Sequence, residues 1–190
     1  MDRIPWYSLF SHTGAETERL ADALSSRFEL KCALTNNMNY WTHLHWGSPL
    51  YGKVIKTFSD NINATLGMGT LPPGSLVTLN GYNRILPGWV LEALRRRCAL
   101  VYNIHPAPIQ LYPELRGLDP HRKLYEGVQS GKYQFIGVVI HEVDEGVDTG
   151  PVAHWKLKLA DPSWSYEELC EESHALGFEA WMEFFNGQNY

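Results

Sequence analysis

The sequence predicts an α/β fold, a doubly wound and mostly parallel sheet in a single domain. In the first half of the chain, short apolar runs alternate with amphipathic helical patterns, and polar turn residues follow the runs. Such alternation calls for parallel strands joined by right-handed crossovers. The length of 190 residues also fits one domain. Sheets of this kind bind ligands beyond the carboxyl ends of their strands, so the loops after residues 10, 79, 104 and 143 are the candidate sites.

The first half of the chain supplies four of the expected strands. They are apolar runs over residues 4–10, 30–35, 76–79 and 99–104. A helix is expected to begin near Glu16, because apolar residues then recur at helical spacing through Leu20, Leu24 and Phe28. Thr13 and Glu16 have the spacing of a capping box at its start.

Residues 36–74 form the least regular segment, rich in Asn, Gly, Pro, Trp and His, with one short helix expected over 50–58. A further helix is expected over 89–97. It ends in Arg95, Arg96 and Arg97, which favour the negative end of the helix dipole, and a substrate anion site is the alternative interpretation.

The second half opens with a long proline-rich loop over residues 106–120. A helix over 121–130 and strands over 135–143 and 152–159 follow. Ser165 and Glu168 predict a capping box for a closing helix, whose apolar residues recur at helical spacing.

Charge and composition argue against several classes of protein. The net charge of −5 and a pI near 5.9 argue against a protein that binds nucleic-acid phosphates. Three widely spaced cysteines without a Cys-x-x-Cys pair argue against a disulfide framework or a thiolate metal site. His43 and His45 lack a further ligand at a recognisable spacing, so no metal is expected. There is no signal segment and no apolar run of membrane-spanning length, so we expect no membrane partner and a cytoplasmic protein.

Two segments carry groups suited to catalysis. Asn103 and His105 end an apolar strand, and side-chain alternation places them on the same side. An acidic turn further on contains Asp148, and a carboxylate near an imidazole can orient the ring for acid or base work. The alternatives are a core histidine bonded to backbone, an asparagine that makes a turn before Pro106, and a solvated acidic hairpin.

These motifs resemble the 10-formyltetrahydrofolate-dependent formyltransferases, the group of the glycinamide ribonucleotide, methionyl-tRNA and amino-sugar enzymes. The resemblance rests on Asn103-x-His105-Pro106, on Arg116-Gly117 in the following loop and on Asp148-x-Gly150-Pro151, and it runs from about residue 76 to 159. It implies a Rossmann-like catalytic domain over residues 1–190, which transfers a formyl group from 10-formyltetrahydrofolate to a primary amine without a metal.

The resemblance also implies the role of each site residue. Asn103 stabilises the oxyanion, His105 handles the oxyanion and the proton, and Asp148 orients His105. The folate ring is expected between two loops and beside one histidine, and the residues concerned are Arg84, Ile85, Leu86, His141, Val143 and Asp144. A solvated surface charge is the alternative for Arg84.

The acceptor side departs from the glycinamide ribonucleotide enzymes. They bind substrate phosphate at the helix start after the first strand, through Gly-Ser-Asn, where this chain reads Thr13-Gly14-Ala15-Glu16. A carboxylate there would repel a phosphate, so Glu16 is expected to meet hydroxyls or a cationic amine, or only to cap its helix. His12 and Gly14 are the neighbouring substrate candidates.

Trp41 is a further substrate candidate, one of an aromatic cluster with Tyr40, Trp46 and Tyr51 that could stack on a nucleobase. Core packing is the alternative interpretation. The expected acceptor is a small amine. If the aromatic cluster stacks on a nucleobase, that amine is carried on a nucleotide or nucleoside.

The chain ends where the methionyl-tRNA enzymes carry a further domain, and it is acidic, so no tRNA is expected. A homodimer is left open. Two other functions remain as alternatives, a formyltetrahydrofolate hydrolase and a non-catalytic folate or nucleotide binder.

Overall fold

The computed structural model describes residues 3–40, 48–68 and 71–187. Its contacts divide the chain into two compact units, residues 1–103 with 143–146 and residues 104–142 with 147–190. Strand β5 (Leu100–His105) begins in the first unit and ends in the second. That residues 1–190 form a single catalytic domain stays a prediction.

The strands of the first unit confirm the expected class of fold. They are β1 (Ile4–Phe10), β2 (Phe28–Thr35), β3 (Val54–Lys56), β4 (Leu76–Leu79) and the first part of β5. Their order is β3-β2-β1-β4-β5, and each neighbouring pair is parallel. Helices α1 (Ala15–Ala23), α2 (Ser59–Gly67) and α3 (Gly88–Arg95) connect them, as the alternating pattern predicts.

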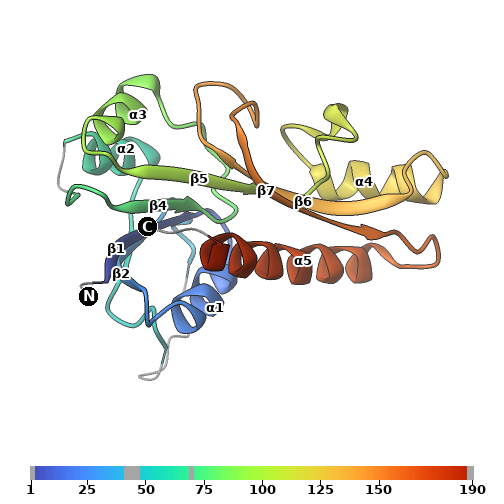
Figure 1. The fold of residues 1–190 in the computed structure, drawn as a ribbon, viewed down its shortest axis with the longest axis horizontal. Helices are drawn as coiled ribbons and strands as arrows, with labels where there is room; N and C mark the ends of the chain where they lie inside the picture. The colour runs from blue at the N-terminus through green and yellow to red at the C-terminus, as the bar shows by residue number, and fades with distance from the viewer. Residues whose placement is uncertain (1–2, 41–47, 69–70, 188–190) are drawn as a thin grey trace. The chain divides into compact units, whose positions relative to one another are not determined.

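Helices cover both faces of this sheet, with α2 and α3 on one side and α1 on the other (Figure 1). The main core of the first unit lies against α2 and α3, because the strands and these two helices present apolar side chains to one another. Its buried members are Leu9, Leu34, Ile62, Leu66, Leu71, Val77, Leu79, Tyr82, Leu86, Val90, Leu91 and Leu94.

The prediction of a helix over residues 50–58 is wrong. Val54 and Ile55 lie in β3 instead, where β-branched side chains fit the pleated strand, and Val54 is registered against Ala33 of β2. Helix α2 begins only at Ser59, after Phe58 in an extended conformation. The β-branched pair and the partner strand outweigh the helical spacing of the apolar residues.

The capping box expected at the start of α1 is also wrong. Gly14 occupies the N-cap position with φ of 70°, and no side chain caps the helix. The helix therefore begins one residue later than the box requires, so Thr13 and Glu16 do not pair across its first turn. At the carboxyl end of α3, Arg95 and Arg96 both form ion pairs with Glu92.

The second unit is built on an antiparallel pair. β6 (Phe135–Glu142) pairs with β7 (Val152–Leu159), and helices α4 (Pro120–Gln129) and α5 (Tyr166–Gly187) accompany them. A short 3-10 helix, η1 (Pro113–Leu115), lies in the proline-rich loop. The capping box of α5 is confirmed, since Glu168 Oε2 accepts from the Ser165 amide and Ser165 Oγ from the Glu168 amide.

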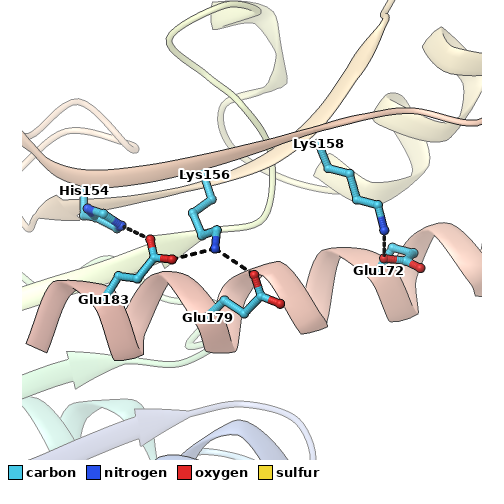
Figure 2. Close-up of polar contacts among 6 residues, drawn as sticks. All are labelled: His154, Lys156, Lys158, Glu172, Glu179 and Glu183. Atoms are coloured by element: carbon cyan, nitrogen blue, oxygen red, sulfur yellow. Dashed lines mark hydrogen bonds and ion pairs between the residues drawn. The ribbon is translucent and has the colours of Figure 1, made fainter. Parts of the chain in front are cut away.

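Ion pairs join β7 to α5 in the second unit (Figure 2). Lys156 lies between Glu179 and Glu183, with Nζ 2.7 Å from one carboxylate oxygen of each. His154 also contacts Glu183, and Lys158 contacts Glu172 at 2.6 Å. None of the helices in the described ranges is long and apolar enough to cross a membrane.

Candidate active site

A buried histidine at the end of β5 faces a carboxylate. The side chain of His105 is 4% exposed, and its Nδ1 lies 3.1 Å from Oδ2 of Asp148. Its other ring nitrogen, Nε2, lies 2.9 Å from the carbonyl oxygen of Leu115. A carbonyl and a carboxylate both only accept hydrogen bonds, so the ring satisfies both contacts when each nitrogen carries a hydrogen.

The backbone of Asp148 is in the left-handed region, with φ of 53°. This conformation costs a residue other than glycine about 1–3 kcal/mol, and it persists where the surroundings hold it. Two contacts from the proline-rich loop hold it here. The Gly117 amide donates to Oδ2 at 2.9 Å, and Arg116 Nε donates to the main-chain oxygen of Asp148 at 3.0 Å.

These contacts also keep Asp148 ionised. Burial by itself raises the pKa of a carboxyl group, but hydrogen bonds from His105, His141 and the Gly117 amide outweigh burial. The pKa of Asp148 therefore lies well below its usual range.

His141, predicted to lie beside the folate, contacts the same carboxylate. It is buried on β6, with Nε2 3.4 Å from Oδ1 of Asp148. Its Nδ1 lies 2.8 Å from the carbonyl oxygen of Glu142, which fixes the ring. The turn that brings Asp148 back requires Gly150, since a Cβ there would lie 1.9 Å from the Glu142 oxygen.

Asn103 precedes His105 by two residues on β5 and is half-buried. Because side chains alternate along a strand, Asn103 and His105 lie on the same side of β5. The strand thus places an amide and an imidazole side by side.

The predicted folate loops lie together in the first unit. Val143 packs against the core that contains the buried Leu86. Ile85 is 59% exposed beside it, and Arg84 is exposed. In the loop over residues 143–146, Oδ1 of Asp144 accepts from the Gly146 amide. This loop lies against the start of α3, where a Cβ on Gly88 would lie 2.5 Å from a carboxylate oxygen of Glu145.

The predicted acceptor residues are only partly described. His12 is exposed, and Gly14 lies against the ring of Phe10, where a Cβ would come within 2.9 Å of a ring carbon. Glu16 is half-buried in the first turn of α1. Trp41 and Trp46 lie outside the described residues, as do His43 and His45. Within the described part of the chain, no group of three or more His, Cys, Asp or Glu side chains is placed to hold a metal ion.

The model of the formyl transferase family matches residues 72–184, more than half of the chain. The chain belongs to the formyl transferase family. The matched residues include Asn103, His105 and Asp148, the three predicted from the strand end and the acidic turn.

Relatives within the formyl transferase family support the same membership. The chain is 32% identical over 105 residues to the methionyl-tRNA formyltransferase of Wolbachia pipientis, which covers 55% of this chain and 32% of that protein. It is 30% identical over 102 residues to the phosphoribosylglycinamide formyltransferase of Bacillus subtilis. The matched residues make up 53% of this chain and 47% of that protein. The chain thus spans about a third to a half of these relatives.

A solved structure extends the likeness of fold to nearly the whole chain. The phosphoribosylglycinamide formyltransferase of Anaplasma phagocytophilum superposes with a TM-score of 0.77 at 20% identity, covering 97% of this chain and 86% of that one. Because tRNA-acting enzymes are among the relatives in sequence, the expectation that no tRNA binds conflicts with these comparisons.

Three contacts of this candidate site were not assigned from the sequence. They are the Leu115 carbonyl on His105 and the two donors, Arg116 and Gly117, on Asp148. The Arg116-Gly117 pair is visible as part of a motif, but no pattern in the sequence shows which atoms of Asp148 it contacts.

Proposed function

We propose that the protein transfers the formyl group of 10-formyltetrahydrofolate to a primary amine. The observation that carries the proposal is the buried His105, whose Nδ1 faces the ionised Asp148 and whose Nε2 faces a carbonyl oxygen. Such a ring is a hydrogen-bond donor at the end of a strand, where an α/β sheet binds its ligands. Membership of the formyl transferase family supports the same chemistry.

The folate would be held by the two loops of the first unit. Leu86 and Val143 offer apolar surface for a flat ring, and the exposed Ile85 extends it. The main-chain amides of Asn83, Val143 and Gly146 already donate within the chain, so the edge of the ring would take its polar contacts from other main-chain groups of the two loops. An apolar surface with a few polar groups beside it suits a pterin.

Asn103 and His105 would stabilise the oxyanion. When the amine attacks, the new C–N bond forms and the carbonyl electron pair moves to the formyl oxygen. The Asn103 amide and His105 Nε2–H can donate to that oxygen, and a donor of this kind contributes about 10²–10³ in rate. For His105 to do so, the formyl oxygen replaces the Leu115 carbonyl as the acceptor of Nε2–H.

His105 would also move the proton that the reaction requires. The attacking amine loses a proton, and N10 of the folate gains one as its bond to the formyl carbon breaks. His105 can give its proton to N10 and recover one from the amine directly or through water. Asp148 holds the ring in place and offsets its charge throughout.

The test replaces His105 or Asp148 by alanine and follows the absorbance of released tetrahydrofolate. We expect turnover to fall by at least about 10²-fold in each, the low end of general acid–base contributions. His154→Ala serves as the control, because this histidine of β7 forms an ion pair with the exposed carboxylate of Glu183 (Figure 2). Near-normal turnover in either site variant would contradict the assignment.

The same assay separates the alternative functions. Formate that appears without any amine would identify a hydrolase, in which water replaces the amine. Folate binding without loss of formyl would identify a non-catalytic binder. Three further properties remain proposals. They are a small amine as the acceptor, a homodimer and a cytoplasmic location.

A further inference from the structure

A cavity of about 500 Å³ opens in the first unit where α2 and α3 end. This volume is within the range of sites that hold small ligands, roughly 300–1,000 Å³. The cavity adjoins the residues that lead into β4 and β5, whereas His105 lies at the other end of β5. Among the described residues, its lining consists of Gly67, Pro73, Ala93, Arg96, Arg97 and Cys98.

Two arginines bring positive charge to this cavity. Arg96 forms an exposed ion pair with Glu92, and because such a pair contributes little stability, Arg96 can exchange Glu92 for another carboxylate. Arg97 is half-buried, and its guanidinium forms no hydrogen bond or ion pair within the described part of the chain. The described lining residues include no carboxylate. An anionic ligand would therefore meet two guanidinium groups in this cavity.

The cavity also carries an exposed cysteine, Cys98. Cys98 follows the end of α3 with φ of 53°, in the left-handed region where helices most often place a glycine. Its amide donates to the Arg95 carbonyl at 2.9 Å, so the backbone of Cys98 completes the end of the helix. A glycine would do the same with less strain. The end of the helix therefore gives no reason for a thiol at this position.

The other two cysteines, Cys32 and Cys170, are half-buried. Burial raises the pKa of the Cys32 thiol to about 11, and burial also raises the pKa of the Cys170 thiol. The thiolate is the form that attacks a disulfide, so both thiols are poor nucleophiles near neutral pH. Among the three cysteines, Cys98 combines an exposed position with a place in a cavity that contains arginines.

We propose that this cavity is a modification site, at which Cys98 exchanges with an anionic disulfide of the glutathione class. The Cys98 thiol loses its proton to water, and the thiolate attacks one sulfur of the disulfide. A new S–S bond to Cys98 forms as the original S–S bond breaks, and the other half leaves as a thiolate that takes up a proton. The Cys98 sulfur is oxidised and the leaving sulfur is reduced. Arg96 and Arg97 bind the carboxylates of the disulfide.

The first test asks which thiol reacts. The full chain is incubated with glutathione disulfide at about pH 8, and the mixed disulfide at each cysteine is followed by peptide mass spectrometry. We expect Cys98 to react at least about tenfold faster than Cys32 or Cys170, because burial lowers the thiolate fraction of those two. Cys98→Ser should lose the fast reaction, and Cys32→Ser should keep it. A smaller difference between Cys98 and either half-buried thiol would overturn the proposal.

The second test measures the recognition of charge, by comparing glutathione disulfide with the uncharged disulfide of mercaptoethanol. We expect Arg97→Gln to lower the preference of Cys98 for glutathione disulfide by about two- to fivefold, the size of an exposed ion pair. Salt at about 1 M should lower the preference of the wild type in the same direction, because it screens exposed charges. Arg95→Gln is the matched control, since Arg95 ends the same helix but does not line the cavity. A preference unchanged in Arg97→Gln, or lowered equally in Arg95→Gln, would contradict the proposal.

A further variant, Cys98→Gly, separates loss of the thiol from loss of the fold. Because φ of 53° suits glycine, this variant should unfold at the same urea concentration as the wild type or at a higher one. The folded variant should form no mixed disulfide at the fast rate. A folded Cys98→Gly protein that still reacts at the wild-type rate would show that the modified thiol lies elsewhere. None of these outcomes depends on formyl transfer, so the proposed function is tested separately.

Discussion

Asp148 shows how a single residue can depend on a loop distant in the sequence. Its left-handed backbone is unfavourable, and Arg116 Nε donates to its main-chain oxygen at 3.0 Å. Arg116 lies 32 positions earlier in the chain. In the proposed reaction Arg116 would therefore act through Asp148, as a positioning residue.

Replacement of Arg116 by alanine should lower kcat about tenfold or more while leaving KM for the folate nearly unchanged. The reason is that Asp148 loses the contact that holds its backbone, and misplaced catalytic groups lose rate. Steady-state kinetics with Lys123→Ala, an exposed cation of the following helix, as control measure the split. An effect confined to KM would show that Arg116 contacts substrate instead.

At the same scale, the sequence predicts the identity of the site residues better than their contacts. Asn103, His105 and Asp148 follow from a strand end and a motif, which depend on order along the chain. The contact between the Leu115 carbonyl and His105 cannot be predicted in this way, because the backbone geometry of a loop leaves no periodic pattern in the sequence. The N-cap of α1 differs for a similar reason, since Gly14 adopts a conformation that the capping-box spacing does not take into account.

Among the elements, β7 and α5 are joined by charges on their facing sides (Figure 2). Lys156 is 22% exposed and contacts two carboxylates, whereas Lys158 contacts one. Exposed ion pairs are each worth about 0.2–1 kcal/mol. The hydrogen bonds to Glu179 and Glu183 also raise the pKa of Lys156.

Lys156→Met should lower the free energy of unfolding by about 1 kcal/mol, and Lys158→Met by less, because one residue loses two pairs and the other loses one. Urea unfolding at low salt and at about 1 M salt provides the measurement, since salt screens exposed pairs. Equal losses in the two variants, or losses that do not shrink with salt, would argue that packing dominates.

Elements were predictable where one periodicity stood out. β1 and β4 match the expected ranges, because each is an apolar run bounded by polar turns. The segment before α2 could not be predicted in this way, because Val54 and Ile55 form a short strand whose partner, β2, lies distant in the sequence. A three-residue edge strand gives too short a pattern to outweigh helical spacing.

For the whole molecule, the ionised Asp148 links stability to pH. Its native pKa lies below the usual value near 3.9, so the unfolded chain binds the proton more tightly. The stabilisation is therefore complete above about pH 5 and is lost as the pH falls through the unfolded value toward the native one. Asp148→Asn should flatten the acid side of the stability curve, as measured by urea midpoints between pH 6 and pH 2. An acid limb unchanged by the substitution would show that other carboxyl groups dominate it.

Formyl transfer from folate to an amine is the central claim for the whole molecule. The most direct test mixes the protein with 10-formyltetrahydrofolate and primary amines, then quantifies tetrahydrofolate, formate and formylated amine by mass spectrometry. We expect tetrahydrofolate and formylated amine to form in equal amounts, both products to require the amine, and the His105→Ala variant to form neither. Tetrahydrofolate accompanied by formate in the absence of an amine, or no loss of formyl with any amine, would contradict it.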